Sequence, residues 1–162
     1  MRSSTMGAQV VPSAVLFDRE EIARWVPHRP PMLLLDGILA FEPDARCTSV
    51  RRARTDEHFV AGHFPGNAIV PGIYLIENLA QTACFLAQRS AAVAAAATPV
   101  LARVERCSFS APVRPPADLV TQVEVLRTLD TLSIYAGTCR VGGRVVCRAE
   151  IVVGRHEERS AA

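Results

Sequence analysis

One long helical pattern runs from Gly72 to about Ala97, and it is apolar on nearly every side. A helix on the surface of a globular protein carries a single apolar stripe, so a helix of this kind must be enclosed by the rest of the chain. Pro71 suits the opening turn of the helix, and Pro99 lies just past its end. The sequence therefore has to supply other elements that surround this helix.

Strand-like segments lie on both sides of the helix in the sequence. They are rich in β-branched and apolar residues and are separated by turn signals such as Gly142-Gly143. The segments are Leu33–Phe41, Cys47–Ala53, Val100–Phe109, Leu119–Arg127, Leu132–Val141 and Arg144–Val153. The first is ambiguous by periodicity, because leucine also suits helices. Antiparallel strands joined by short turns can curl around one helix, so we predict an α+β fold in which the sheet wraps around one long central helix.

The chain is predicted to form a single domain. We expect a flexible N-terminus over residues 1–17, the domain over residues 18–154 and a C-terminal tail over residues 155–162. Within the domain, Asp18 suits the N-cap of a short helix that ends at Pro27.

Composition and charge exclude several classes of function. The formal net charge is only +2 and no basic run is interleaved with aromatic residues, so no nucleic-acid partner is expected. All 18 basic residues are arginine, which excludes Schiff-base chemistry on lysine. Neither a signal-peptide pattern nor an uninterrupted apolar span is present, so we expect a cytoplasmic protein that does not enter a membrane. No nucleotide-binding motif or metal-ligand spacing is found, and we expect neither a cofactor nor a metal.

The five cysteines form no C-x-x-C pair. Cys139 and Cys147 flank the Gly142-Gly143 turn, but a two-residue hairpin loop would place Cys139 opposite Val146 and turn Cys147 to the other face. We therefore expect free, mostly buried thiols.

The most informative stretch for function is GHFPGNAIVPGIYLIENLAQ, residues 62–81. It places His63 in a loop bracketed by glycine and proline, and Glu77 as a lone acid in the buried helix. Burial of an unpaired carboxylate is costly, so Glu77 must be neutral, paired or functional. Gln81 lies four residues further along the same helix face, and Tyr74 is a close neighbour. Desolvation tends to raise the pKa of a glutamate, which suits a general acid near neutral pH.

This stretch resembles the signature of the FabZ-type 3-hydroxyacyl-[acyl-carrier-protein] dehydratases, a family with the hot-dog fold. The family pattern is G-H-F-P-G-x-P-[IV]-[ML]-P-G, followed by a helical run to E-A-[LM]-A-Q, and His63 and Glu77 match its spacing of 14 residues. Upstream, PHRPPMLLLDGIL is similar to the family's P-H-R-x-P-[FM]-L-L-[VL]-D-R. Downstream, RVERCSFSAPVRPPADL is similar to its strand with F-x-x-P-V-x-P-G-D. The likeness extends over about residues 22–153.

The resemblance implies a single hot-dog domain, with the sheet wrapped around the central helix. It also implies a homodimer with sites at the interface, often assembled as a trimer of dimers, and a heterodimer stays open. His63 would remove the C2 proton of a 3-hydroxyacyl thioester that is linked through phosphopantetheine to acyl carrier protein. Glu77 of the facing protomer would protonate the departing C3 hydroxyl, and the Gly72 N–H would bind the thioester carbonyl.

Three further residues are candidates for substrate binding: Phe64, Tyr74 and Gln81. Of these, Gln81 is favoured as a support for Glu77. His28, in the upstream motif, is interpreted as a structural residue.

The sequence departs from the family pattern at several positions, which are Gly37 in place of arginine, Ala68 in place of proline, Asn78 where alanine is common, and Pro116-Ala117 in place of Gly-Asp. These departures affect what can be predicted about the acyl chain length of the substrate, carrier recognition and hexamer contacts. The catalytic pair is intact.

Arginines near the family motifs could form a basic rim for an acidic carrier protein. The candidates are Arg51, Arg52, Arg54, Arg103, Arg106 and Arg114. The alternative is a solvated strand face, and the residues alone leave both interpretations open.

Three functions are weighed. The leading one is dehydration to the trans-2-enoyl thioester, in fatty acid or polyketide biosynthesis. A hot-dog acyl thioesterase is the first alternative, which the signature suits less because hydrolysis needs an activated water. A non-catalytic carrier-binding subunit of a heteromeric dehydratase is the second, and the intact His63 and Glu77 count against it. Combined isomerisation is less favoured, because related isomerising enzymes typically carry Asp at the position of Glu77.

Overall fold

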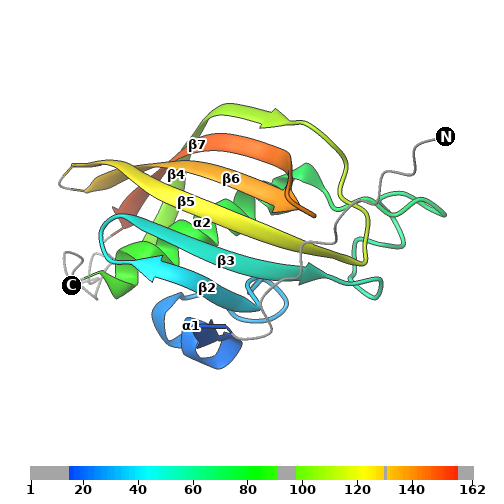
Figure 1. The fold of residues 1–162 in the computed structure, drawn as a ribbon, viewed down its shortest axis with the longest axis horizontal. Helices are drawn as coiled ribbons and strands as arrows, with labels where there is room; N and C mark the ends of the chain where they lie inside the picture. Colours follow the sequence, from blue (N-terminus) through cyan, green and yellow to red (C-terminus); the bar gives the residue numbers. More distant parts are fainter. Residues whose placement is uncertain (1–14, 91–97, 130, 157–162) are drawn as a thin grey trace, which may run out of the picture.

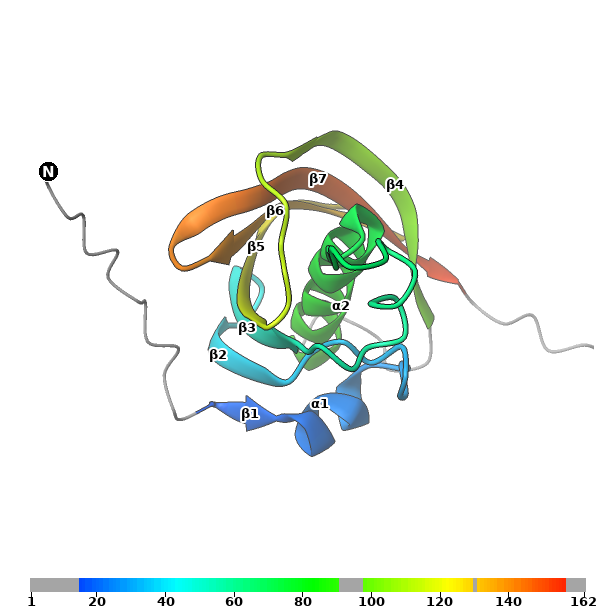
Figure 2. The same cartoon turned by 90° about the vertical axis from the view of Figure 1, so that its right-hand side faces the viewer.

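The long helix α2 (Gly72–Arg89) lies in the hollow of one curved antiparallel sheet, as Figures 1 and 2 show. The computed structural model describes residues 15–90, 98–129 and 131–156. The remaining elements are β1 (Phe17–Asp18), α1 (Arg19–Trp25), β2 (Gly37–Glu42), β3 (Arg46–Ala53), β4 (Thr98–Phe109), β5 (Ala117–Leu129), β6 (Leu132–Val141) and β7 (Arg144–His156). The predicted α+β fold, a sheet wrapped around one long central helix, is confirmed.

The strands follow the order β1-β2-β3-β5-β6-β7-β4, and every neighbouring pair is antiparallel. From β3 the chain passes through a long loop and α2 to β4 at the far edge of the sheet, and then returns so that β5 pairs with β3. This crossover carries α2 across the concave face of the sheet (Figure 2). The edge strand β4 pairs only with β7.

Apolar side chains of α2 fill the space between the helix and the sheet. Leu79 and Phe85 are completely buried, and the Phe85 ring lies 5.5 and 5.9 Å from the ring centroids of Phe17 and Phe41. Gly137 of β6 faces Leu79, where an added Cβ would come within 2.5 Å of a Leu79 methyl carbon. Glycine at this position therefore lets the helix and the sheet approach closely.

The long helix ends earlier than the sequence predicts. The prediction extends it to about Ala97, whereas α2 ends at Arg89 because Ser90 takes an extended conformation. The Ser90 hydroxyl accepts the N–H of Asp44 at 2.8 Å, so its side chain bonds outside the helix, as serine commonly does at helix ends. Residues 91–97 of the predicted helix lie outside the described residues.

The strand predicted over Leu33–Phe41 begins only at Gly37, as β2. Three leucines before it, Leu33 to Leu35, are buried, but the backbone of Leu34 bonds to a side chain, and only the Asp36 N–H reaches the neighbouring strand β3 within the described residues. The Leu34 N–H donates to Oε1 of Gln81 at 2.9 Å, and the Met32 carbonyl accepts from Nε2 of the same side chain at 2.7 Å. An apolar run alone does not distinguish a buried linker from a buried strand. The other five predicted strands correspond to β3 to β7.

The short helix predicted after Asp18 is confirmed as α1. The Asp18 carboxylate accepts the N–H of Glu21 at 2.9 Å, which satisfies one of the free donors at the helix start. The helix ends at Trp25, close before Pro27.

The β6–β7 hairpin turns where the sequence predicts, but its register changes near the cysteines. A shift next to Cys139 brings this residue opposite Cys147 instead of Val146. The expectation that Cys147 faces the other side is therefore wrong, because a bulge adds a residue to one strand and changes every facing pair beyond it. Both thiols are buried and free.

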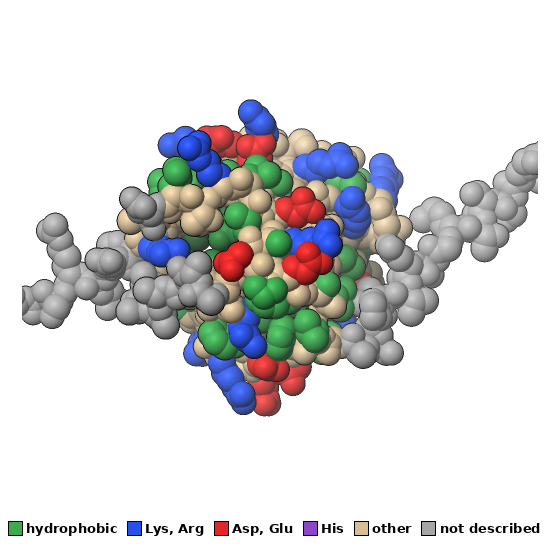
Figure 3. Space-filling model, turned by 60° about the vertical axis from the view of Figure 1, so that its left-hand side comes forward, with side chains coloured by type: hydrophobic (Ala, Val, Ile, Leu, Met, Phe, Trp, Pro, Cys, Tyr) green, Lys and Arg blue, Asp and Glu red, His purple; other side chains and the backbone are tan. Residues whose placement is uncertain are grey.

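Figure 3 shows one face of the molecule, on which arginine and acidic side chains are interspersed with apolar ones. This mixture agrees with the small net charge of +2 and gives the face no field of a single sign. In the described ranges, no helix is long and apolar enough to cross a membrane.

We expect Leu79→Ala to lower the free energy of unfolding by about 2–5 kcal/mol, because this fully buried side chain would leave a cavity between α2 and β6. Leu126→Ala is the matched control, at a position of β5 that is 53% exposed, and should change the free energy by no more than about 0.5 kcal/mol. Urea denaturation followed by circular dichroism measures both. Equal losses in the two variants would contradict this packing.

Candidate active site

The loop between β3 and α2, residues 54–71, carries His63. Its glycines and prolines exclude regular secondary structure, so individual hydrogen bonds fix it instead. The carbonyl of the buried Phe59 accepts the His63 N–H at 2.8 Å, and the His63 carbonyl accepts the Ile69 N–H at 2.7 Å. The Val70 N–H donates to the segment that precedes β5, at 2.8 Å. The loop is therefore anchored on both sides of His63.

The imidazole of His63 is oriented by the same loop. Its Nδ1 lies 2.8 Å from the carbonyl oxygen of Ile69. A carbonyl can only accept, so this contact places the ring proton on Nδ1 and leaves the lone pair on Nε2. The ring of Phe64 stacks on the imidazole, with centroids 4.2 Å apart. His63 therefore has the tautomer and the fixed orientation that a general base needs.

His63 borders an open cavity of about 500 Å³. The cavity lies between the loop, the start of α2 and the end of β4, and its lining is mostly apolar. The other lining residues are Ile69, Val70, Gly72, Leu75, Phe109, Ser110, Ala111, Pro112 and Val113. A concave site of this size with few polar groups is typical of small-molecule binding.

Gly72 begins α2 at the edge of this cavity. Its N–H has no partner within the helix, and Pro71 at the N-cap offers no side-chain hydrogen bond. A Cβ at position 72 would lie 3.0 Å from the ring of Phe109, so glycine permits the close contact between them. The positive end of the α2 dipole therefore borders the cavity, next to His63.

Glu77 does not line this cavity. Its Oε1 lies 3.3 Å from Nε2 of His28 and accepts a hydrogen bond from Nε2 of Gln81 at 2.8 Å. Within the described part of one chain, Glu77 and His63 form neither a hydrogen bond nor an ion pair. In the single chain, the Glu77 carboxylate thus contacts His28 and Gln81, whereas His63 contacts Ile69 and lines the cavity.

The carboxyl group of Glu77 has a pKa below its ordinary value. The main cause is the contact with His28, which favours the anion; desolvation acts in the opposite direction, and Gln81 adds a smaller lowering. The expectation of a raised pKa is therefore wrong for the single chain. The sequence indicates that Glu77 is buried, but it does not indicate that His28 lies beside it and lowers its pKa by more than burial raises it.

Tyr74 is not among the residues that line the His63 cavity. Its hydroxyl lies 2.6 Å from Nε2 of His58, and the guanidinium carbon of Arg51 lies 5.4 Å from its ring centroid. Arg51 itself is buried and bonds to Glu57. Arg51 therefore belongs to a structural cluster and is not part of an exposed basic rim.

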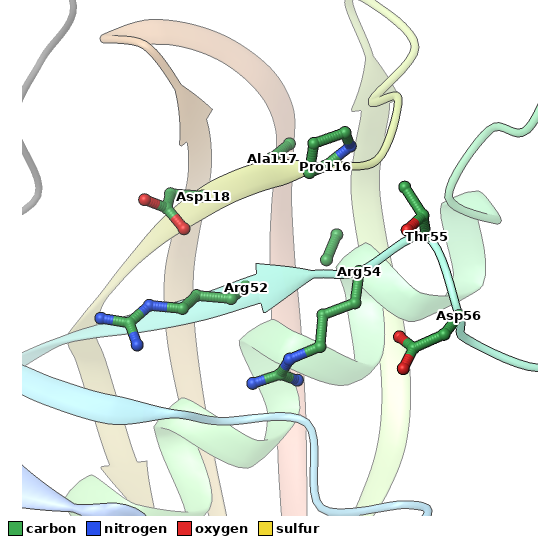
Figure 4. A pocket seen from close by; sticks show the side chains of 8 residues that line it. Arg52, Arg54, Thr55, Asp56, Pro116, Ala117 and Asp118 are labelled. Atoms are coloured by element: carbon green, nitrogen blue, oxygen red, sulfur yellow. The ribbon is translucent and has the colours of Figure 1, made fainter.

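Most other arginines of the predicted rim are exposed but neutralised. Three form ion pairs at 2.8, 2.9 and 2.7 Å, which are Arg54–Asp36, Arg103–Glu105 and Arg106–Glu150. Figure 4 shows Arg52 and Arg54 at an open cavity of about 620 Å³, where Asp56 and Asp118 also lie. Arg114 is exposed and follows Val113 of the His63 cavity directly in the chain.

Three of the thiols, those of Cys47, Cys84 and Cys107, are poor nucleophiles because their pKa values are raised. Four of the five are buried, and burial raises the pKa of Cys47 and of Cys84 to about 12. Cys107 is exposed, yet partial desolvation raises its pKa as well. Among the described residues, no group of three or more His, Cys, Asp or Glu is arranged to hold a metal ion.

Comparison with known proteins identifies the family. Residues 26–150 match the family model described as a FabA-like domain. The chain belongs to the FabA-like family. This match spans most of the domain, including the His63 loop and α2.

Curated relatives of this FabA-like chain are named 3-hydroxyacyl-[acyl-carrier-protein] dehydratase FabZ. The protein of Nitrosospira multiformis is 35% identical over 137 residues, covering 83% of this chain and 94% of its own. That of Caulobacter vibrioides is 36% identical over 134 residues, covering 82% and 84%. Among solved structures, the dehydratase heterocomplex ApeI:P from Xenorhabdus doucetiae matches with a TM-score of 0.71, 17% identity and coverage of 85% and 91%. This structural likeness supports the hot-dog fold alone.

The sequence motif predicts His63, Gly72 and Glu77 as site residues, but it does not predict that His28 contacts Glu77. His28 is interpreted from the sequence as structural, and its only signal is its place in the PHRPP segment. The two residues are 49 positions apart in the sequence (77 − 28 = 49), so no pattern of local spacing predicts the contact.

Proposed function

We propose that this FabA-like protein is a dehydratase that converts a 3-hydroxyacyl thioester on acyl carrier protein into the trans-2-enoyl thioester, in the cytoplasm and in fatty acid biosynthesis. One observation carries the proposal: the His63 imidazole, with its lone pair on Nε2, borders the same cavity as the N-terminus of α2. A base beside a helix N-terminus suits removal of a proton next to a carbonyl. The names of the curated relatives support the same reaction.

In this proposal, each group moves one proton or binds one charge. Nε2 of His63 takes the C2 proton, and the electrons of the C2–H bond form the new double bond between C2 and C3. The C3–O bond breaks, and the oxygen leaves as water after it receives a proton from Glu77. The Gly72 N–H binds the thioester oxygen, on which negative charge develops. No electron is lost or gained overall, so the reaction requires no redox cofactor.

Glu77 would come from a second copy of the chain. Two observations support this source: Glu77 does not line the His63 cavity of its own chain, and its side chain is still 25% exposed. Covering it with a second chain adds desolvation, which raises the pKa of a carboxyl group and favours the protonated acid. Phe64 would keep the His63 ring in place, Gln81 would support Glu77, and Tyr74 would border the acid side of the shared site.

The edge strand β4 would form the interface of a homodimer. One of its sides has no strand partner, and it exposes Val100, Leu101 and Phe109. An exposed apolar edge strand is a template for pairing with another chain. Phe109 also lines the His63 cavity, so a second copy on this edge would lie beside the site. A related subunit could occupy the same edge in a heterodimer.

Incubation of 3-hydroxyacyl carrier protein with the wild-type protein should produce a mass loss of one water. His63→Ala and Glu77→Gln should each slow this reaction by about 10²–10⁴-fold, because each removes a positioned acid or base. Intact-protein mass spectrometry follows the substrate. Release of the free acid would instead indicate a thioesterase, and no reaction at several chain lengths would indicate a carrier-binding subunit.

A mixture of the two inactive variants tests the shared site. When His63→Ala and Glu77→Gln are co-expressed, the mixed dimer has one site with both residues intact and one with neither. Random pairing should restore about a quarter of the wild-type activity, because half the dimers are mixed and each has one working site of two. The separately purified variants are the controls. Failure of the mixed dimer, isolated with two different tags, to exceed them would place both residues in one chain.

Arg114 is the arginine best placed to recognise an acidic carrier protein, because it is exposed next to the cavity. Arg114→Glu should raise KM for the carrier-bound substrate about tenfold or more at low salt, and change KM for a small thioester analogue little. Arg127→Glu, an exposed arginine at the opposite end of β5, is the matched control. Equal changes in KM for both substrates would exclude a role in docking.

A further inference from the structure

Among the residues that the structure describes, the hydrogen-bond and ion-pair partners of the Glu77 carboxylate all lie at Oε1. Nε2 of His28 and Nε2 of Gln81 both approach Oε1, at 3.3 and 2.8 Å. Gln81 is completely buried, and its remaining bonds tie it to the backbone of Met32 and Leu34 in the segment that follows His28. The two contacts on Oε1 therefore come from groups that are themselves fixed.

His28 is also held in place by its own segment. Its side chain is 25% exposed, and it lies two residues after the buried Val26, just beyond the end of α1. The guanidinium of Arg29 donates to the carbonyls of Val26 and His28 at 3.0 and 2.7 Å, which closes the turn around the histidine. The imidazole is thus presented to Glu77 by a bonded turn.

The surroundings of His28 select one tautomer of its ring. Nδ1 is buried and has no hydrogen-bond partner among the described residues. A proton on Nδ1 would be a buried donor without a partner, whereas a proton on Nε2 points at a carboxylate oxygen. The proton therefore belongs on Nε2, where it is donated to Glu77.

We propose that His28 is a positioning residue for the acid of the dehydratase, which together with Gln81 occupies Oε1 of Glu77 so that Oε2 is the oxygen presented to the substrate hydroxyl. This inference rests on the proposed function. His28 acts through Glu77 and does not touch the reacting atoms.

Two consequences follow for the proton that Glu77 transfers. In the protonated acid, the hydrogen belongs on Oε2, because Oε1 accepts an N–H of Gln81 and also faces Nε2 of His28 at 3.3 Å. After the transfer, the same two donors stabilise the negative charge left on the carboxylate, which lowers the barrier to giving up the proton. His28 therefore sets both the direction of proton delivery and the acidity of the group.

Among the described residues, two titratable groups interact electrostatically with Glu77. One is His28 in the segment after α1, and the other is the buried thiol of Cys84 on α2. Gln81, the second donor, does not titrate. The lowered pKa of Glu77 is in line with this arrangement, since its first cause is the contact with His28.

The decisive experiment compares wild type, His28→Ala, His28→Gln and Arg29→Ala. Carbon-13-detected NMR of glutamate-labelled protein measures the pKa of the Glu77 carboxyl, with Glu77→Gln to identify its signal. We expect a higher pKa in His28→Ala, because a donor that favours the anion is lost, and a return toward the wild-type value in His28→Gln, whose amide can donate to Oε1. Arg29→Ala loosens the turn that holds His28 without touching Glu77, so it should raise the pKa of Glu77 by less than His28→Ala does.

The same four proteins are then assayed over a range of pH. In His28→Ala, kcat should fall about tenfold with little change in KM, and the limb of the pH profile that Glu77→Gln abolishes should move to higher pH. Thermal unfolding verifies that each variant is folded. An unchanged pKa of Glu77 in both His28 variants would overturn the proposal even if the protein dehydrates its substrate. If the pKa of Glu77 shifts but the protein has no dehydratase activity, the effect of His28 on Glu77 is supported and the proposed function is rejected.

Discussion

The enclosure of α2 is the constraint on which the rest of the structure depends. In a helix that is buried on most sides, polar side chains need hydrogen-bond partners, and three of those on α2 bond to three different parts of the chain. Thr82 bonds to Ser49 of β3 at 2.7 Å, and Asn78 bonds to Thr121 of β5 at 2.6 Å. Gln81 bonds to the segment between α1 and β2. Together these bonds set the rotation of α2 about its axis.

This rotation determines where the candidate site residues of α2 lie. It brings the first turn of α2, with Gly72 and Leu75, to the His63 cavity, and it turns Glu77 toward His28. The proposed base is thus carried by an anchored loop and the proposed acid by the helix. Because Glu77 does not line the His63 cavity of its own chain, the proposed site includes a second chain. The unpaired edge of β4, next to the cavity, is where that chain would lie.

The parts that could be predicted are those with a local signal. The apolar pattern of α2, the alternation in β5 to β7 and the Gly142-Gly143 turn each reflect a short-range rule, and the motif around His63 is a specific local signature. The misses share a different cause, which is tertiary contact. Leu33–Leu35 is buried like a strand but bonds to Gln81, and Ser90 ends the helix by bonding to Asp44. The lowered pKa of Glu77 arises from His28, which is distant in sequence.

The pKa of Glu77 in the single chain differs from the pKa that the reaction in the proposed dimer would need. In the single chain its pKa is below the ordinary value, so its ionised form stabilises the fold at pH values above the ordinary pKa, and this contribution is lost as the pH falls through the lowered one. An acid in dehydration must instead carry a proton when the substrate arrives. Desolvation already acts against the lowering of this pKa. A second chain over the exposed quarter of the side chain would increase the desolvation and raise the pKa. Assembly would therefore both bring Glu77 to His63 and move its pKa toward the value that proton donation requires, which links the oligomeric state to the chemistry through a single carboxyl group.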